Sequence, residues 1–400
     1  MSRFSYREHA ELPKNSYKPL RAIWVFFVVG LITFFLLAAC KSENRVSQKL
    51  TSENVEAFAD EFFAKAMREH HIPGVSLVVV NDGAILIAKG YGLANRGTQT
   101  PIDPYATVMR IGSISKLFVA TAVMQLVEQD TLDLHQDINQ YLQGSQFIVD
   151  NRYSEPVTLA HLLTHTSGYG ETWQSSTSPE DYPSLGDYLA KNMPDRLAPP
   201  GAEWCYSGHG MALAAYVVEV VSGERFDQYV QTHILQPLQM DHSRYVLDSS
   251  LPHGLAQGYA YENWVYEPQP MDYYGDYPSA SLVATAGDMA KFMLAYLNDG
   301  CLGDGCILRP ETIALTQSEQ IQTQEGGHAF GFVQGFRNGE RLIGHSGAIR
   351  GFGAIMDLIP GRDTGYFFAF NLECLDSSAC EIIPEFRTAF MDLFFIEETP

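Results

Sequence analysis

The stretch Arg110-Ile111-Gly112-Ser113-Ile114-Ser115-Lys116 decides how this sequence is interpreted. It holds the only Ser-x-x-Lys of the chain, and the uncharged, mostly apolar run over 117–127 after it predicts a buried helix. Residues three apart share one face of a helix, so the Lys116 amine could take the proton of the Ser113 hydroxyl. A helix N-terminus also offers free backbone N–H groups to an oxyanion. The stretch therefore predicts a nucleophile for acyl transfer, and a chance match is the alternative.

Hydrophobic periodicity divides the rest of the chain into strand-rich ends and a helical middle. Helical spacing over 54–70 precedes a hairpin, in which Asn81-Asp82-Gly83 joins apolar runs at 75–80 and 84–88. The later strand signals lie at 330–333, 341–345, 353–358 and 366–370, before a last helix over 381–396. The helices expected between them cover 113–128, 158–164, 207–221, 225–234 and 286–297.

This order of elements predicts an α+β fold of the α/β-sandwich type. We expect one antiparallel sheet, assembled from both chain ends and flanked by the terminal helices, with an all-helical subdomain beside it. The prediction is a single domain over 54–400 with a helical insert at about 113–300. Ser113 falls at the junction, and a cleft between the two halves is the expected site.

The first 40 residues predict an export signal. Five Lys or Arg precede the uncharged stretch 22–39, and Leu37-Ala38-Ala39-Cys40 resembles the lipobox of bacterial lipoproteins, in which the cysteine after the cut carries lipid. An uncleaved membrane anchor is the alternative, because eighteen such residues could also span a bilayer. Either way, residues 41–53 would be a tether. The protein is expected in the bacterial cell envelope, membrane-attached and facing the periplasm or the exterior.

Charge and cysteine content limit the partners. The chain has a net charge of −21, and residues 40–400 carry −24 because residues 1–39 hold five Lys or Arg and two Asp or Glu. Such an acidic protein is not expected to bind nucleic acid. Two cysteine pairs could close small loops, Cys301 with Cys306 and Cys374 with Cys380. Cys205 is left over, and a buried free thiol is favoured over a redox role.

Further segments resemble the serine β-lactamase and penicillin-binding-protein superfamily, in its class C β-lactamase-like branch of esterases, D-aminopeptidases and D-alanyl-D-alanine carboxypeptidases. Residues 200–208, which contain Tyr206-Ser207-Gly208, resemble the segment leading to Tyr-x-Asn. His345-Ser346-Gly347-Ala348 resembles the Lys-Thr-Gly strand in a His-x-Gly form. Segments 162–168 and 281–290 resemble two structural segments. The resemblance runs from about residue 55 to the C-terminus and implies a β-lactamase/transpeptidase-like fold.

The resemblance implies a role for each matching residue. Ser113 would be the nucleophile and Lys116 its proton partner, with Tyr206 sharing protons with Lys116. The backbone N–H groups of Ser113 and Ala348 would form the oxyanion hole, on a strand where Gly347 and His345 border the substrate. Either Lys116 loses its proton through burial or a positive neighbour, or Tyr206 acts as a phenolate. No cofactor and no metal are implied.

Two departures from the family pattern bear on the substrate. Gly208 stands where the family usually has an Asn that holds the substrate's acyl-amide group. His345 replaces a Lys that binds a substrate carboxylate, and an imidazole is mostly neutral at pH 7. The predicted function is a membrane-tethered serine hydrolase of small esters or D-amino-acid peptides, more than of β-lactams. The alternatives are a non-catalytic peptidoglycan- or β-lactam-binding sensor or scaffold, and a true class C-type β-lactamase.

Three other patterns are given a structural interpretation. Residues 344–348 nearly match the G-x-S-x-G elbow of α/β-hydrolases with Ser346 as nucleophile, but the fifth residue is Ala and no helix follows. His161 and His165 have the i, i+4 spacing of zinc ligands without the glutamate of metalloproteases, so packing or capping is favoured. Some aromatic residues could line a pocket but are more simply core or loop anchors: Trp173, Trp264, Tyr273 and Tyr274.

Overall fold

The computed structural model describes residues 47–150, 152–172, 174–181, 184–324, 326–375 and 377–396. The predicted signal with its Cys40, and Trp173, lie outside these residues. Among the helices within them, none is long and apolar enough to cross a membrane.

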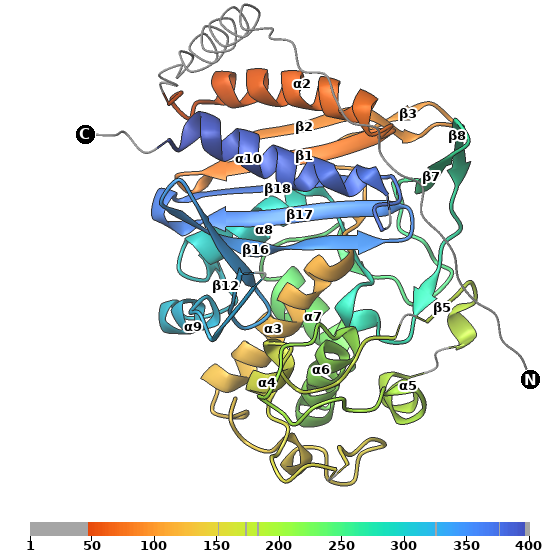
Figure 1. The fold of residues 1–400 in the computed structure, drawn as a ribbon, viewed down its shortest axis with the longest axis vertical. Helices are drawn as coiled ribbons and strands as arrows, with labels where there is room; N and C mark the ends of the chain where they lie inside the picture. The colour runs from red at the N-terminus through yellow and green to blue at the C-terminus, as the bar shows by residue number, and fades with distance from the viewer. Residues whose placement is uncertain are drawn as a thin grey trace, which may run out of the picture. The chain divides into compact units, whose positions relative to one another are not determined.

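Within the described residues, nine strands form an antiparallel sheet that both ends of the chain build together, as predicted (Figure 1). Its central strand β1 (Gly74–Asn81) pairs on one side with β2 (Ala84–Asn95) and on the other with the late strand β18 (Thr364–Phe370). The other strands in sheet order are β13 (Ile321–Thr323), β14 (Gly326–His328), β15 (Val333–Arg337), β16 (Glu340–Ile349) and β17 (Phe352–Ile359), with β3 (Thr100–Pro101) beyond β2.

Side chains alternate between two hydrophobic cores, one on each face of this sheet. On β1, Val75, Leu77 and Val79 enter one core, whereas Val78 and Val80 enter the other. Successive strand residues point to opposite faces, so a strand buried on both sides is a continuous apolar run. This explains why the sequence predicted β1 without an alternating pattern.

The two terminal helices, α2 (Ser52–Glu69) and α10 (Ile382–Phe394), lie side by side over one face of the sheet (Figure 1). Phenylalanines join them: the ring of Phe58 lies 5.5 Å from Phe386 and 5.7 Å from Phe394 between centroids. Aromatic pairs at this separation add to the gain from burial. The first and last helices thus hold both ends of the chain on one sheet.

On the other face lies the helical part, which carries α3 (Ser115–Glu128) and α8 (Ala286–Leu297). Every residue of α3 from Ser115 to Leu126 is buried, which suits its nearly uniform apolar sequence. The remaining helices of this side are α4 (Leu159–Leu163), α5 (Leu185–Asn192), α6 (Gly208–Ser222), α7 (Phe226–Val230) and α9 (Pro310–Thr316).

The structure departs from the predicted elements in several places. The insert also contains short strands, among them β6 (Arg244–Tyr245) and β10 (Leu282–Ala284), so it is not all helical. These two form one small sheet with β4 (Met109–Arg110), which lies just before the insert. Two-residue strands have no periodicity to detect. The strand predicted at 330–333 begins only at Val333, because Gly331 has φ of +78°. Helices α5 and α9 were not predicted.

The cysteines follow the expected pairing. Cys301 is bonded to Cys306, and Cys374 to Cys380. Cys205 is a free thiol and is half-buried rather than buried.

Candidate active site

Ser113 lies in a 3-10 turn, Gly112–Ile114, that runs directly into α3. The sequence analysis placed Ser113 in the same helix as Lys116, whereas α3 itself begins at Ser115. The Ser115 hydroxyl donates to the carbonyl of Gly112 at 2.6 Å and accepts from the N–H of Leu282 at 3.1 Å. These two bonds fix the turn, and Ser113 still precedes the N-terminus of a long buried helix.

Lys116 contacts Ser113 directly. Its Nζ lies 3.0 Å from Ser113 Oγ and donates to the carbonyl of Ser279 at 3.0 Å. Ser279 ends a short 3-10 turn, Tyr277–Ser279. Lys116 is 1% exposed and Ser113 6%. The predicted pair therefore meets in a setting with little water, where a hydrogen bond between an amine and a hydroxyl is stronger than in bulk water.

Tyr206 reaches the same site from the loop before α6. Lys116 Nζ lies 4.8 Å from the centroid of the Tyr206 ring. The centroid of the His165 ring lies 4.5 Å from the same Tyr206 centroid. His165 Nδ1 accepts from the N–H of Ser207 at 3.2 Å, and the His165 carbonyl accepts from Cys205 at 2.8 Å. His165 is thus a positioning residue for Tyr206.

Strand β16 approaches the 3-10 turn at a distance that requires glycine. A Cβ on Gly347 would lie 2.0 Å from the Ile111 carbonyl oxygen and 3.2 Å from the Ser113 nitrogen. A Cβ on Gly112, whose φ is +54°, would lie 2.8 Å from the Ala348 nitrogen. The backbone nitrogens of Ser113 and Ala348 therefore both lie where β16 meets the turn. Their role in an oxyanion hole stays a prediction.

His345 faces this site from β16 as a neutral imidazole. Its Nδ1 lies within hydrogen-bond distance of the Ser346 carbonyl, which can only accept, so Nδ1 carries the proton. Burial and the nearby Lys116 ammonium lower the pKa of His345 to about 4. Its Nε2 is a buried acceptor without a partner in the described parts of the chain. His345 therefore does not supply the positive charge of the lysine that it replaces.

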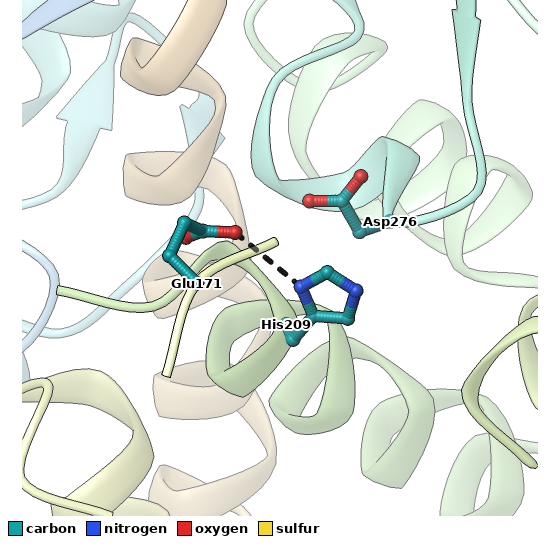
Figure 2. A group of neighbouring side chains, drawn as sticks. All are labelled: Glu171, His209 and Asp276. Carbon is teal, nitrogen blue, oxygen red and sulfur yellow. Dashed lines mark hydrogen bonds and ion pairs between the residues drawn. The ribbon is translucent and has the colours of Figure 1, made fainter. Parts of the chain in front are cut away.

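A group of ligating side chains beside Lys116 escaped the sequence analysis. Oxygen or nitrogen atoms of Glu171, His209 and Asp276 lie within 4.8 Å of one another, and Figure 2 shows both carboxylates near the imidazole, with a dashed line between Glu171 and His209. These residue types could hold a cation. These residues come from three segments that are distant in the sequence, and they match no motif. The replacement of the family's Asn by Gly208 was the one sequence signal that could have drawn attention to this region. The prediction that no metal takes part stays a prediction.

The structure also shows where the three other sequence patterns lie: the elbow-like segment with Ser346, the His161 and His165 pair, and the aromatic residues. Ser346 is exposed in the middle of β16, paired with Ile355, and so is not on a strand-to-helix elbow. His161 Nδ1 accepts from the N–H of Thr158 at 3.3 Å and caps α4. The side chain of Trp264 is 84% exposed. A cavity of about 370 Å³ is lined by Leu185, Tyr273, Tyr274, Gly275 and Tyr277 among others, and Ser113 is not part of its lining.

Comparison with known proteins identifies the family. The Beta-lactamase family model matches residues 59–381. The chain belongs to this family. Penicillin-binding protein 4 of Amycolatopsis lactamdurans is 27% identical over 321 residues, which are 75% of this chain and 81% of that protein. Protein flp of Staphylococcus aureus is 24% identical over 330 residues, 81% of this chain, and the chain spans 64% of its length.

A comparison with solved structures leads to the same family as the sequence comparison. The octameric penicillin-binding protein homologue from Pyrococcus abyssi has a TM-score of 0.72 and 28% identity, over 84% of this chain and 77% of that one. The resemblance to the serine β-lactamase and penicillin-binding-protein superfamily and the predicted fold class are therefore confirmed.

The glycine contact between β16 and the 3-10 turn yields a first test. Gly347→Ala would place a methyl group against the Ile111 carbonyl and push the strand away from Ser113. We expect the rate of Ser113 labelling by a fluorophosphonate to fall about a hundredfold, because small displacements of reacting groups are costly. Gly335→Ala in β15, where a Cβ meets nothing within 4 Å, is the matched control and should keep its rate. Equal rates in both variants would contradict the close-approach argument.

The buried imidazoles yield a second test, on stability. Burial lowers the pKa of both His345 and His165, so the unfolded chain binds more protons than the folded one below about pH 6.5. Stability should therefore fall as the pH drops from about 6.5 to 4, measured by urea unfolding. His345→Gln should remove about 3 kcal/mol of that pH dependence, from a pKa of about 4. His135→Gln, at an exposed histidine, is the control, and an unchanged slope in His345→Gln would refute the assignment.

Proposed function

We propose that this protein is a serine hydrolase that cleaves ester or amide bonds through an acyl-enzyme on Ser113. The observation that carries the proposal is the 3.0 Å contact between Lys116 Nζ and Ser113 Oγ, both buried, at the start of α3 and against the backbone of β16. Membership of the Beta-lactamase family supports the reaction class. Esters and D-amino-acid peptides are favoured over β-lactams because of Gly208 and the neutral His345.

The geometry gives each group a step. One basic group of the Lys116 and Tyr206 pair, an unprotonated amine or a phenolate, takes the proton of Ser113 as Oγ attacks the carbonyl carbon, and the Ser113 and Ala348 N–H groups receive the negative charge on the carbonyl oxygen. The leaving alcohol or amine then takes the proton from the same pair. Water attacks the acyl-enzyme in the second half of the reaction and returns Ser113 to its free form. The burial of Lys116 keeps bulk water from the proton transfer.

A fluorophosphonate probe tests the nucleophile. The full-length protein, purified in detergent, should carry one adduct, located at Ser113 by peptide mass spectrometry. Ser113→Ala should lose it, and Lys116→Ala should slow labelling by at least about a hundredfold because the hydroxyl is no longer activated. Ser346→Ala is the control and should label normally.

The other outcomes of this experiment separate the alternatives. A folded protein that forms no adduct but binds a β-lactam would be a non-catalytic sensor or scaffold. An adduct on Ser346 would mean that the nucleophile is misassigned. Turnover of nitrocefin far faster than of any short-chain ester would favour a true class C-type β-lactamase.

We also propose that the protein is exported and tethered to the membrane through Cys40. The lipobox-like residues 37–40 and the basic lead before them support this placement. In bacterial cells, Cys40→Ser should move the protein from the membrane fraction to the soluble fraction and abolish labelling by radioactive palmitate. Cys205→Ser, at the free thiol of the folded domain, should change neither. Membrane retention of Cys40→Ser without lipid labelling in the native chain would favour an uncleaved anchor.

A further inference from the structure

A second concave site lies apart from the candidate active site. It is the cavity of about 370 Å³ formed where the start of α5, the end of α6, the segment after β6 and the strand β9 (Tyr273–Tyr274) meet. Its volume is in the range of small-molecule sites in proteins. Of the described residues that line it, none is Ser113, Lys116 or Tyr206. The proposed acyl transfer therefore leaves this cavity without a role.

Apolar and aromatic side chains form one part of the cavity wall. Leu185, Val246 and Tyr273 are all buried. The Tyr273 hydroxyl donates to the carbonyl of Asp248 at 3.2 Å, and β9 pairs with the short strand β5 (Ser175–Ser176). This part of the wall is thus held in place by packing and by hydrogen bonds. A fixed apolar wall suits a ligand with an apolar body.

Charged side chains form another part of the wall, and most of them are acidic. Three carboxylates line the cavity, Glu180, Glu219 and Asp248, against one guanidinium, that of Arg225. Arg225 Nε already donates to the Asp227 carboxylate at 3.0 Å, and the Arg225 side chain is 61% exposed. The lining therefore carries a negative charge that it does not balance itself.

Glu219 is the most enclosed of these carboxylates. It is half-buried, and it has no close ion-pair partner in the described part of the chain. Its Oε1 accepts from the N–H of Phe226 at 2.7 Å and from the Tyr277 hydroxyl at 3.4 Å, whereas Oε2 accepts from none of the described residues. Burial raises the pKa of Glu219, which reflects the cost of ionisation there. A ligand cation at Oε2 would lower this cost.

Two tyrosines of the wall respond to the same negative charge. Burial raises the pKa of Tyr277, and the carboxylates of Glu219 and Asp227 add to this effect. Burial also raises the pKa of Tyr273, to which the Asp248 carboxylate contributes. Both phenols are therefore neutral at physiological pH. The faces of neutral aromatic rings attract cations, so the aromatic and the acidic parts of the wall favour the same kind of ligand.

We propose that this cavity is a second ligand site, which binds a small organic cation with its ammonium group at Glu219 and its apolar body against Tyr273 and Leu185. The inference goes beyond the proposed hydrolase function and does not rest on it. Because the reacting serine is not in the lining, the ligand is bound reversibly and no bond in it is formed or broken.

The experiment compares three related ligands on the full-length protein in a nonionic detergent. Phenethylamine is a cation at about pH 7, phenethyl alcohol is its neutral analogue, and hydrocinnamate is an anion of similar size. Titration calorimetry, corrected for titration into detergent alone, should show that the cation binds at least about tenfold more tightly than the alcohol. The reason is that the alcohol lacks the charged hydrogen bond and the attraction to the rings. The anion should bind more weakly than the alcohol.

Matched variants assign the charge that is responsible. Glu219→Gln should lower the affinity for phenethylamine about tenfold and leave that for phenethyl alcohol unchanged, because the amide oxygen can still accept from Phe226 but carries no charge. Glu311→Gln, at an exposed carboxylate of α9 outside the cavity, should bind as the native protein does. Ser113→Ala should also keep the native affinity, because Ser113 does not line the cavity.

A photoreactive diazirine analogue of phenethylamine gives the location, also in the case that Glu219→Gln does not fold. Its adduct, identified by peptide mass spectrometry, should fall on peptides that contain Glu219, Val246 or Tyr273. Excess phenethylamine should prevent the adduct, whereas the same concentration of phenethyl alcohol should not.

Four results would overturn the inference. If phenethylamine does not bind, or binds no more tightly than phenethyl alcohol, the cavity is not a cation site. Native affinity in Glu219→Gln would remove Glu219 from the contact. Loss of binding in Ser113→Ala, or an adduct on Tyr206, would place the cation in the candidate active site and not in a second site.

Discussion

The site depends on one backbone contact, the approach of β16 to the turn that carries Ser113. Gly347 and Gly112 permit it, because a Cβ on either would meet backbone atoms of the other segment at 2.0 to 2.8 Å. This contact joins the sheet, which both chain ends build, to the first helix of the insert. It places the Ala348 and Ser113 nitrogens together and sets the position from which Lys116 reaches the serine. The long buried helix α3 and the sheet hold the 3-10 turn with Ser113 and the Gly347 part of β16 in fixed positions relative to each other.

Burial gives these groups their chemical character. Lys116 is almost fully removed from solvent and contacts Ser113 and Ser279, so its amine acts on a hydroxyl and not on water. Burial and the nearby Lys116 lower the pKa of His345, which keeps the imidazole neutral. The ring of His165 packs against the ring of Tyr206. Burial also lowers the pKa of His165, so this imidazole is neutral too.

The acidic oxygens around Gly208 change the character of the site relative to the family pattern. An amide at this position offers both a donor and an acceptor, whereas carboxylates offer acceptors only. The change of lysine to His345 acts in the same direction, because it also replaces a donor with an acceptor. Two separate segments thus alter the hydrogen-bonding pattern of the site in the same sense.

The sequence determined much of this protein. Local patterns were enough for the terminal helices, the hairpin of β1 and β2, the late strands and the Ser113 to Lys116 spacing, because apolar periodicity and tight turns act over a few residues. The order of the motifs was enough to identify the family. The roles that it implies for Tyr206 and the β16 segment stay predictions. The sequence did not predict the short strands of the insert or the helices α5 and α9, because their stability comes from packing and not from their own propensity.

Only the tertiary structure brought Glu171, His209 and Asp276 beside Gly208 and fixed the tautomer of His345. These residues have no sequence pattern in common, and their proximity follows from long-range packing of loops on α6 and on the 3-10 turn that ends at Ser279. Their protonation depends on burial and on neighbouring charges, which a linear sequence does not specify.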